Sequence, residues 1–470
     1  MERNKTLVLL ALLMSLFLSS ACDQKEEVSF EGMELFKWNL VVPDNELALC
    51  GNGSPFKFFI NPSNKSKNVM IYFQGGGACW DYESCSGKAG IRGAANPEGI
   101  PDDFMKNGAT PSVMSPFIWR EHPMDDYKTR DWTLIFIPYC TGDIFTGNKV
   151  ITYKDPNGTA PDLVWNHTGH ETVMAVLDWM TTGQYNKEFE EIPTLLVTGS
   201  SAGGAGAFLN YYFIREELGN RVNQGILLND SGPIYPAEDN PEYPEDLSQL
   251  DGDGPHTYEA YPHSVPCQRK VMSSWGGDSV IDLILKDIEG DAALLAMYNE
   301  NNIGLSLTRL ISYKYKNDRI AHTQFSMDEI YSSYLYERFF PNDIDMEKDG
   351  MEVLWNYWQQ EQQLLIDLYD ELNDANGNTG YFIPYYRPFI ESHTVCTIAS
   401  TGTLIDRDIN GEYINVDAKD FIVDLLNPEI PMGQLRYIEN PSPLERDGPL
   451  PTALRDVVDK LMEFMDRIGK

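Results

Sequence analysis

The sequence predicts an α/β fold with a mostly parallel central sheet, helices on both faces and large loop insertions. A short apolar, β-branched strand at 192–197 leads into a helix with apolar residues at 208–213, and another strand follows at 225–228. Strands that alternate with helices pair in parallel through right-handed crossovers. No internal repeat or linker interrupts the chain, so residues 32–470 are expected to form one domain.

The remaining elements follow from the same patterns. Further strands are expected at 35–42, 57–60, 68–73, 132–139, 305–315 and 381–386. Helices are expected at 279–288, 326–340, 351–372 and 452–468, and one more begins at Thr168, where Glu171 completes a capping box. The segment 233–268 is rich in Pro, Asp, Glu and Tyr without a clear period, which is typical of a lid or a binding loop.

The candidate nucleophile is Ser201, the middle residue of Gly199-Ser200-Ser201-Ala202-Gly203. A Gly-x-Ser-x-Gly motif between a strand and a helix is typical of a nucleophile elbow, where glycine allows a tight reversal and the serine stands at the helix N-terminus. The motif alone is weak, and a plain glycine-rich turn is the alternative. The flanking strand and helix favour the nucleophile.

A serine nucleophile needs a base and an orienting acid, and in this type of sheet they follow in the order Ser, acid, His. His393 comes after the last predicted strand and is the candidate base. Asp318 comes just after the strand predicted at 305–315 and is the candidate acid, unless it caps the next helix. Asp328 is the alternative acid. His322 is expected to pair with Asp318 across one helical turn.

The donors for a tetrahedral oxyanion are expected at two places. Gly75-Gly76-Gly77 follows a core strand, and glycine lets backbone N–H groups approach a substrate oxygen. Gly76 and Gly77 are therefore candidate donors, together with the N–H of Ala202, which follows the nucleophile.

The charge of the chain restricts its partners. Asp and Glu number 71 against 36 Lys and Arg, which gives a net charge of −35. Nucleic acids require a basic surface, so they are excluded as partners.

The N-terminus predicts export. Residues 1–21 have a charged start, an apolar run too short to span a membrane, and small residues directly before Cys22. This pattern predicts a lipoprotein-type signal, a lipidated Cys22 that anchors the protein in a bacterial cell envelope, and a tether over 22–31. An ordinary cleaved signal peptide with an incidental cysteine is the alternative.

Six cysteines remain, and an even number in an exported chain indicates disulfides. Fifteen pairings are possible, and Cys79 and Cys85 flank a loop short enough for a bridge. No Cys or His spacing predicts a metal site. Residues 406–417 imitate a calcium-binding loop, but Asn410-Gly411 between two apolar stretches favours a hairpin turn.

Several segments together resemble the family of pectin acetylesterases and Notum carboxylesterases. The matching segments are 50–55, 73–80, 137–143, 199–204 and 230–232. The resemblance implies an α/β-hydrolase-like fold and a triad of Ser201, Asp318 and His393. It also implies the disulfides Cys50–Cys140, Cys79–Cys85 and, for the last two cysteines, Cys267–Cys396. The motif residues Trp80, Asp143 and Asp230 are expected in the substrate pocket.

The expected function is that of an exported serine carboxylesterase that needs no cofactor or metal. Members of the family remove acetyl groups from pectin or a fatty acyl group from a protein. A chain with a net charge of −35 is poorly matched to polyanionic pectin, so a neutral acetylated glycan is at least as plausible. The alternatives are a non-catalytic surface lipoprotein that binds glycans and a deacylase of longer lipid chains.

Overall fold

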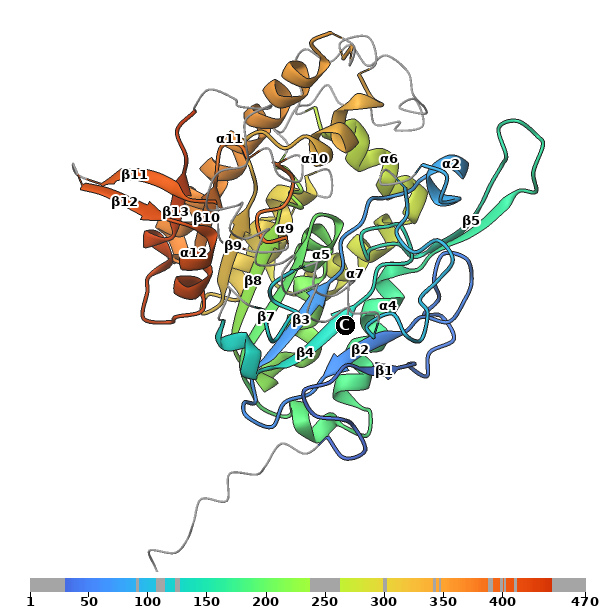
Figure 1. Cartoon of the computed structure of the whole chain (residues 1–470), viewed down its shortest axis with the longest axis horizontal. Helices are drawn as coiled ribbons and strands as arrows, with labels where there is room; N and C mark the ends of the chain where they lie inside the picture. The colour runs from blue at the N-terminus through green and yellow to red at the C-terminus, as the bar shows by residue number, and fades with distance from the viewer. Residues whose placement is uncertain are drawn as a thin grey trace, which may run out of the picture.

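The computed structural model describes residues 30–89, 93–106, 115–122, 127–236, 263–298, 302–340, 344–345, 348–387, 392–397, 400, 403–409 and 412–441. Within these residues the fold is built on a nine-stranded sheet of order β1-β2-β4-β3-β7-β8-β9-β10-β13 (Figure 1). The strands are β1 (Asn39–Val41), β2 (Phe58–Asn61), β3 (Val69–Phe73), β4 (Thr133–Ile137), β7 (Ile192–Ser200), β8 (Val222–Asp230), β9 (Arg319–Thr323), β10 (Thr379–Ile383) and β13 (Arg436–Ile438).

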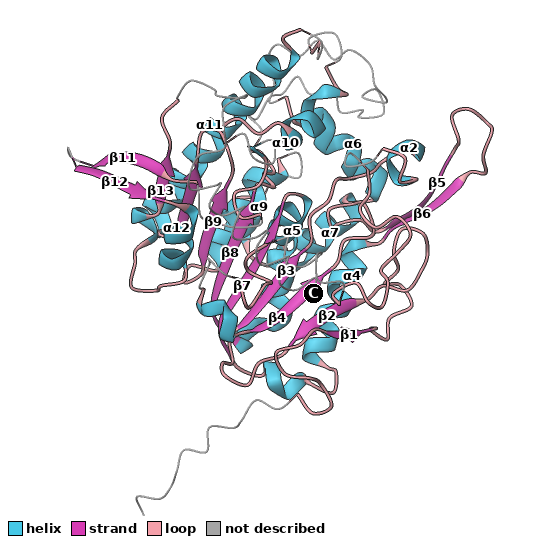
Figure 2. Ribbon diagram, in the orientation of Figure 1, coloured by secondary structure: helices cyan, strands magenta, loops and turns pink. Residues whose placement is uncertain are grey.

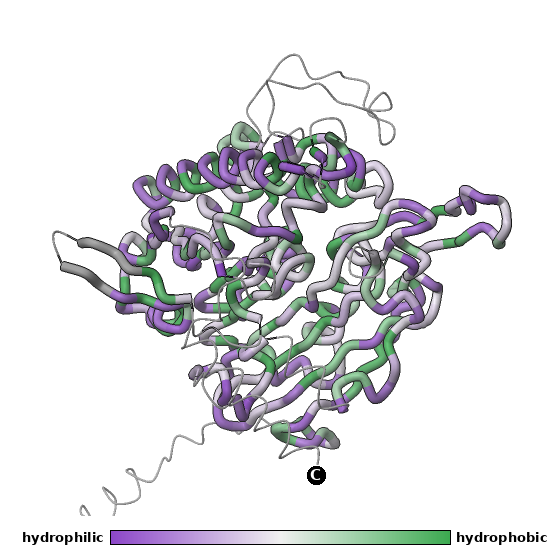
Figure 3. The backbone as a smooth tube through the Cα atoms, turned by 45° about the horizontal axis from the view of Figure 1, so that its top comes forward, coloured by the Kyte–Doolittle hydropathy of each residue, from purple (hydrophilic) through white to green (hydrophobic). Residues whose placement is uncertain are grey.

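The sheet is mostly parallel. Every neighbouring pair from β4 to β13 is parallel, and only the β1–β2 and β2–β4 pairs are antiparallel. Strands β3, β4, β9 and β10 are buried at every position, as expected where a parallel sheet is covered. The central strands are accordingly apolar (Figure 3). The α/β character predicted from the sequence is confirmed.

Helices surround this sheet (Figure 2). They are α2 (Tyr82–Cys85), α4 (Gly169–Thr181), α5 (Ala202–Leu218), α6 (Val265–Trp275), α7 (Asp278–Ile288), α8 (Ala292–Leu295), α9 (Ile303–Lys314), α10 (Ile330–Ser332), α11 (Gly350–Asn376) and α12 (Ala418–Leu425). Short 3-10 turns lie at Lys128–Asp131, Asn186–Phe189, Gly219–Arg221 and Met432–Gln434, and the π turn η6 covers Ser333–Glu337. Helix α5 packs against β3, β7 and β8, while α11 packs against β10.

The strand predicted at 305–315 is wrong, because this segment forms helix α9. Its buried residues Leu307, Leu310 and Ile311 repeat at helical spacing, and the Asn302 side chain caps the helix by accepting from the N–H of Leu305. The strand in this part of the chain is β9, which begins only at Arg319.

Other element boundaries differ in smaller ways. Thr168 is the N-cap of α4, but its hydroxyl donates to the carbonyl of Leu49, so the predicted capping box is absent. The helix predicted at 326–340 is shortened to α10 and η6, and α6 begins within the segment expected to be irregular. Residues 237–262 of that segment and the helix predicted at 452–468 lie outside the described residues.

Two hairpins project from the body of the molecule, as Figure 1 shows. One is formed by β5 (Lys149–Tyr153) and β6 (Leu163–His167), and the other by β11 (Ile405–Ile409) and β12 (Glu412–Val416). Ile409 stands opposite Glu412 in the second, which confirms a hairpin instead of a calcium-binding loop. Asp417 serves as the N-cap of α12.

The predicted signal peptide, Cys22 and most of the tether lie outside the described residues. Among the helices that the structure describes, none has the length and apolar character required to span a bilayer.

Candidate active site

Ser201 lies at the turn between the end of β7 and the start of α5. Its backbone has φ 57° and ψ −125°, a strained conformation for a residue with a side chain. The turn requires glycine on both sides, because a Cβ at Gly199 or Gly203 would lie 2.5 or 2.1 Å from the carbonyl oxygen of Phe73. The sequence motif therefore corresponds to a strand-to-helix turn of the nucleophile-elbow type.

The glycine run after β3 lies directly beside this turn. A Cβ at Gly75 would stand 2.3 Å from the carbonyl oxygen of Ser200. Gly77 (φ 52°) lines the same small cavity as Ser201 and Ala202. Gly76 (φ 132°) is not among the lining residues, and its Cα faces Ala95. Of the expected oxyanion donors, the structure brings Gly77 and Ala202 to Ser201.

His393 and Asp328 form a buried pair beyond the ends of two neighbouring strands. The His393 Nδ1 and Asp328 Oδ2 atoms are 2.8 Å apart, and Asp328 also accepts from the N–H groups of Ile330 and Tyr331. Burial raises the pKa of Asp328, and His393 and these hydrogen bonds oppose the increase. The ring of Tyr331 stacks beside His393 at 6.2 Å and lines the Ser201 cavity. The histidine is thus close to the serine's cavity.

Asp318 is not the partner of His393, and its assignment as the triad acid is wrong. Its carboxylate lies 2.6 Å from Nε of Arg215 and accepts from the hydroxyl of Tyr211 and the N–H of Gly225. It precedes β9, whereas His393 follows the neighbouring strand at the opposite end of the sheet. The five residues of β9 alone separate the two ends by about 16 Å. The error follows directly from assigning the strand to 305–315.

Asp230 lies beneath the site instead of in the substrate pocket. Its buried carboxylate accepts from the N–H groups of Val395 and Cys396, just after His393, and from the hydroxyls of Ser200 and Thr323. Burial raises its pKa, and these donors oppose the increase. Asp230 therefore ties the loop of the histidine to the ends of β7, β8 and β9.

Asp143 is likewise buried away from the cavity. It accepts from the hydroxyl of Thr141 and from the N–H groups of Phe145 and Gly169, so it fixes the start of α4 to the loop after β4. Burial raises its pKa to about 6. The expectation that Asp143 and Asp230 line the substrate pocket is therefore not met.

The cavity at Ser201 is small and apolar, with a volume of about 60 Å³. Trp80 lines it, as expected from the sequence. Helix α6 contributes Cys267, Val271 and Trp275 at positions i, i+4 and i+8. This stripe was missed by sequence reasoning, although its helical spacing is a signal that could have revealed it.

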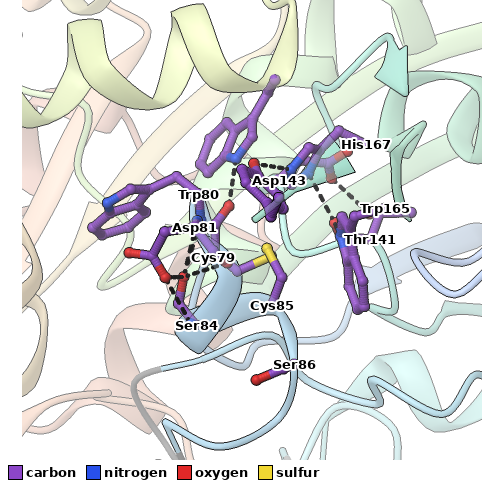
Figure 4. The surroundings of a disulfide bond; sticks show 12 residues. Cys79, Trp80, Asp81, Ser84, Cys85, Ser86, Thr141, Asp143, Trp165 and His167 are labelled. Carbon is purple, nitrogen blue, oxygen red and sulfur yellow. Dashed lines mark hydrogen bonds between the residues drawn. A yellow bond between two sulfur atoms is a disulfide. The ribbon is translucent and has the colours of Figure 1, made fainter. Parts of the chain in front are cut away.

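Two disulfides hold the loops around the site. Cys50 bonds to Cys140, and Cys79 bonds to Cys85 in the loop after the glycine run (Figure 4). The predicted Cys267–Cys396 bridge is wrong, because both residues are buried thiols that are not joined. His167 stands close to Cys79 and Cys85. Since both sulfur atoms belong to the disulfide, the group is not a metal site. His167 instead contacts the carbonyl of Thr141 and the hydroxyl of Tyr153.

A mostly parallel sheet that presents a serine at a strained strand-to-helix turn, with a histidine and an acid beyond later strands, defines an α/β-hydrolase-like protein. Residues 33–243 match the family model of the pectinacetylesterases, which confirms the resemblance inferred from the motifs. The curated relatives that the chain matches are Notum proteins.

The chain is 27% identical over 193 residues to the palmitoleoyl-protein carboxylesterase notum1a of Danio rerio, covering 40% of this chain and 34% of that protein. It is 25% identical over 192 residues to the palmitoleoyl-protein carboxylesterase NOTUM of Mus musculus, covering 40% of this chain and 34% of that protein. It is 26% identical over 193 residues to the palmitoleoyl-protein carboxylesterase NOTUM of Drosophila melanogaster, covering 40% of this chain and 26% of that protein. The chain thus spans about a third of the length of the curated relatives it matches.

Proposed function

We propose that this protein is a serine carboxylesterase in which Ser201, His393 and Asp328 form the catalytic triad. The observation that carries the proposal is the buried His393–Asp328 hydrogen bond at the same end of the sheet as Ser201. Because Asp328 engages Nδ1, the Nε2 atom of His393 remains to accept the proton of Ser201 Oγ.

The proposed reaction proceeds through an acyl-enzyme. Ser201 Oγ attacks the ester carbonyl as His393 takes its proton, and the N–H groups of Gly77 and Ala202 stabilise the oxyanion. His393 then protonates the departing alcohol. Water, deprotonated by the same histidine, releases the carboxylic acid and restores the serine. The residues of this site carry out each step without a cofactor.

The size of the cavity supports a short acyl group, with acetyl as the best fit. Its volume of about 60 Å³ is far below the roughly 300–1,000 Å³ of pockets for drug-sized ligands. The matched relatives are named as palmitoleoyl-protein carboxylesterases, and a long acyl chain would need a much larger cavity. We therefore assign acetyl esters on a glycan as the substrate, in place of lipid-modified protein.

Hydrolysis of 4-nitrophenyl acetate tests the proposed activity. Wild type should be active, and Ser201→Ala should lose at least about 10³-fold in kcat. Equal rates in the two proteins would favour a non-catalytic glycan-binding protein on the same scaffold. A series of esters from acetate to hexadecanoate tests the acyl group, and a maximum at long chains would favour the lipid deacylase.

We also propose that the protein is exported and carries a lipid on Cys22. Two disulfides support an oxidising compartment, and the N-terminal pattern supports the anchor. In a bacterial host, a labelled fatty acid should be incorporated into wild type and not into Cys22→Ala. Label that survives in Cys22→Ala would contradict the anchor.

A further inference from the structure

A second cavity of about 240 Å³ lies beside the one that contains Ser201. It is formed between the loop and helix at 80–89 and the π turn η6. Trp80 and Tyr334 line both cavities, so they form the shared wall. An ester has an acyl part and an alcohol part that must bind together, and the cavity beside the acyl pocket is placed to receive the alcohol part.

The lining of this second cavity is chemically unlike that of the first. Its remaining walls are mostly polar or small, and they are formed by Asp81, Glu83, Ser84, Ala89, Ser333, Glu337 and Arg338. Carboxylates and hydroxyls bind the hydroxyl groups of a sugar, whereas aromatic rings cover its apolar C–H surface. The combination fits one sugar ring, and the volume is below that of drug-sized pockets.

The charge of the lining selects among sugars. The lining contains three carboxylates, those of Asp81, Glu83 and Glu337, and one guanidinium, that of Arg338, so the charges of the lining side chains sum to −2. Arg338 is already engaged, because its Nη2 lies 2.7 Å from Asp81 and its guanidinium lies 5.0 Å from the Trp80 ring. A uronate carboxylate placed here would meet like charges within the screening length of about 8 Å.

The loop that carries Trp80, Asp81 and Glu83 is fixed in place. The Cys79–Cys85 disulfide closes it, and Asp81 accepts from the N–H and the hydroxyl of Ser84 (Figure 4). Trp80 and Asp81 extend from the loop on the side away from Thr141, Trp165 and His167 in this view. The polar wall is therefore preorganised, which lowers the entropic cost of binding.

We propose that the cavity between α2 and η6 is the subsite for the sugar unit that carries the ester, and that it accepts an uncharged pyranose and rejects a uronate. This inference rests on the proposed esterase function for its role in catalysis. It assigns an acetylated neutral polysaccharide as the substrate class, in place of pectin.

The test compares Glu83→Lys with Glu46→Lys, which makes the same charge change at an exposed position on the loop after β1, outside the cavity. The substrates are 4-nitrophenyl acetate, an acetylated xylo-oligosaccharide and an acetylated oligogalacturonate. Wild type should favour the xylo-oligosaccharide. Glu83→Lys should shift the kcat/KM ratio of the two saccharides toward the oligogalacturonate by about tenfold, whereas Glu46→Lys should keep the wild-type ratio. Hydrolysis of 4-nitrophenyl acetate shows that each variant is folded and active. Equal ratios in the two variants, or a wild-type preference for the oligogalacturonate, would overturn the subsite.

Binding measurements distinguish a failure of the sugar subsite from a failure of the proposed esterase function. Calorimetry with Ser201→Ala should show that it binds a neutral xylo-oligosaccharide, and that Ser201→Ala/Glu83→Lys binds it more weakly than Ser201→Ala/Glu46→Lys. If wild type hydrolyses no ester but this difference is seen, the subsite stands and the esterase proposal fails. If esters are hydrolysed and the two double variants bind equally, the subsite fails alone.

Discussion

Asp318 and Asp328 carry the same side chain in different surroundings, and a matched pair of substitutions separates their roles. Asp328→Asn should lower kcat for 4-nitrophenyl acetate by about 10³- to 10⁴-fold, because it disturbs the tautomer and orientation of His393. Asp318→Asn should leave kcat of the folded protein within a few-fold of wild type. It should reduce stability by about 3–5 kcal/mol, because Arg215 loses its buried partner.

The measurements are steady-state kinetics at a temperature where both variants are folded, and urea unfolding of each. A loss of kcat in Asp318→Asn as large as that in Asp328→Asn would contradict the assignment of Asp328 as the triad acid.

The backbone of Ser201 stores strain that a glycine would relieve. Because φ is 57° there, Ser201→Gly should raise the free energy of unfolding by about 1 kcal/mol while abolishing hydrolysis. Ser201→Ala keeps a Cβ at the same φ and should gain less stability, so it serves as the control. Thermal unfolding of the three proteins checks this, and equal stability of the two variants would argue against strain at this turn.

At the residue scale, the sequence predicts those site residues that are required by the geometry of a local turn. Ser201, Gly199 and Gly203 can be recognised because the turn itself demands them. The partner acid cannot be recognised so directly, since its position depends on where a distant strand ends. The sequence offers Asp328 only as the alternative acid, because a strand expected at 305–315 ends just before Asp318.

Helix α6 forms part of the wall of the cavity at Ser201, which is the proposed acyl pocket. Cys267, Val271 and Trp275 line one side of it, and Trp275 is held by the bond from its indole N–H to the carbonyl of Cys79, at 2.7 Å. Val271→Ala removes two carbon atoms from the wall. The ratio of butyrate to acetate hydrolysis should rise, by about fourfold for each methylene newly accommodated.

The measurement is kcat/KM for 4-nitrophenyl acetate, propionate and butyrate. Val423→Ala makes the same truncation at an exposed position of α12, outside the cavity, and should leave the ratio unchanged. If both variants keep the wild-type ratio, α6 does not limit the acyl chain.

At the element scale, the core strands β3, β4, β7 and β8 were predictable because their apolar runs are short and are followed by glycine or polar turns. The segment of α9 was misread because its apolar residues, interrupted by Ser and Thr, fit both a strand and a helix. The packing of this segment against the rest of the protein selects the helix over the strand. Helix α6 was missed because Pro266 near its start looks like part of a loop, although proline is favoured in the first turn of a helix.

At the scale of the whole molecule, a buried carboxylate links stability to pH. Glu361 on α11 accepts from the N–H and hydroxyl of Ser264, just before α6, and from the hydroxyl of Tyr336 in η6. Burial raises its pKa from 4.5 to about 7. The Glu361 side chain therefore joins α6, which lines the cavity at Ser201, to η6, which lines the proposed sugar subsite.

The sign of the pH effect follows from proton binding. Between about pH 4.5 and 7 the folded protein holds a proton on Glu361 that the unfolded chain has released, so the Glu361 contribution to stability is lost as the pH rises through this range. Asp143 acts in the same direction. The buried residues His167, His170 and His322, whose pKa values are lowered to about 3, 4 and 4, act in the opposite direction below about pH 6.5.

Comparison with Glu361→Gln isolates the single group from these opposing effects. The amide keeps an acceptor for Ser264 and cannot ionise. The stability of wild type relative to Glu361→Gln should therefore fall by up to about 3 kcal/mol between pH 5 and pH 8. Urea unfolding of both proteins at pH 5, 6, 7 and 8 gives this difference directly. A difference that is constant with pH would show that Glu361 has an ordinary pKa, and a rising one would show that its carboxylate is stabilised in the fold.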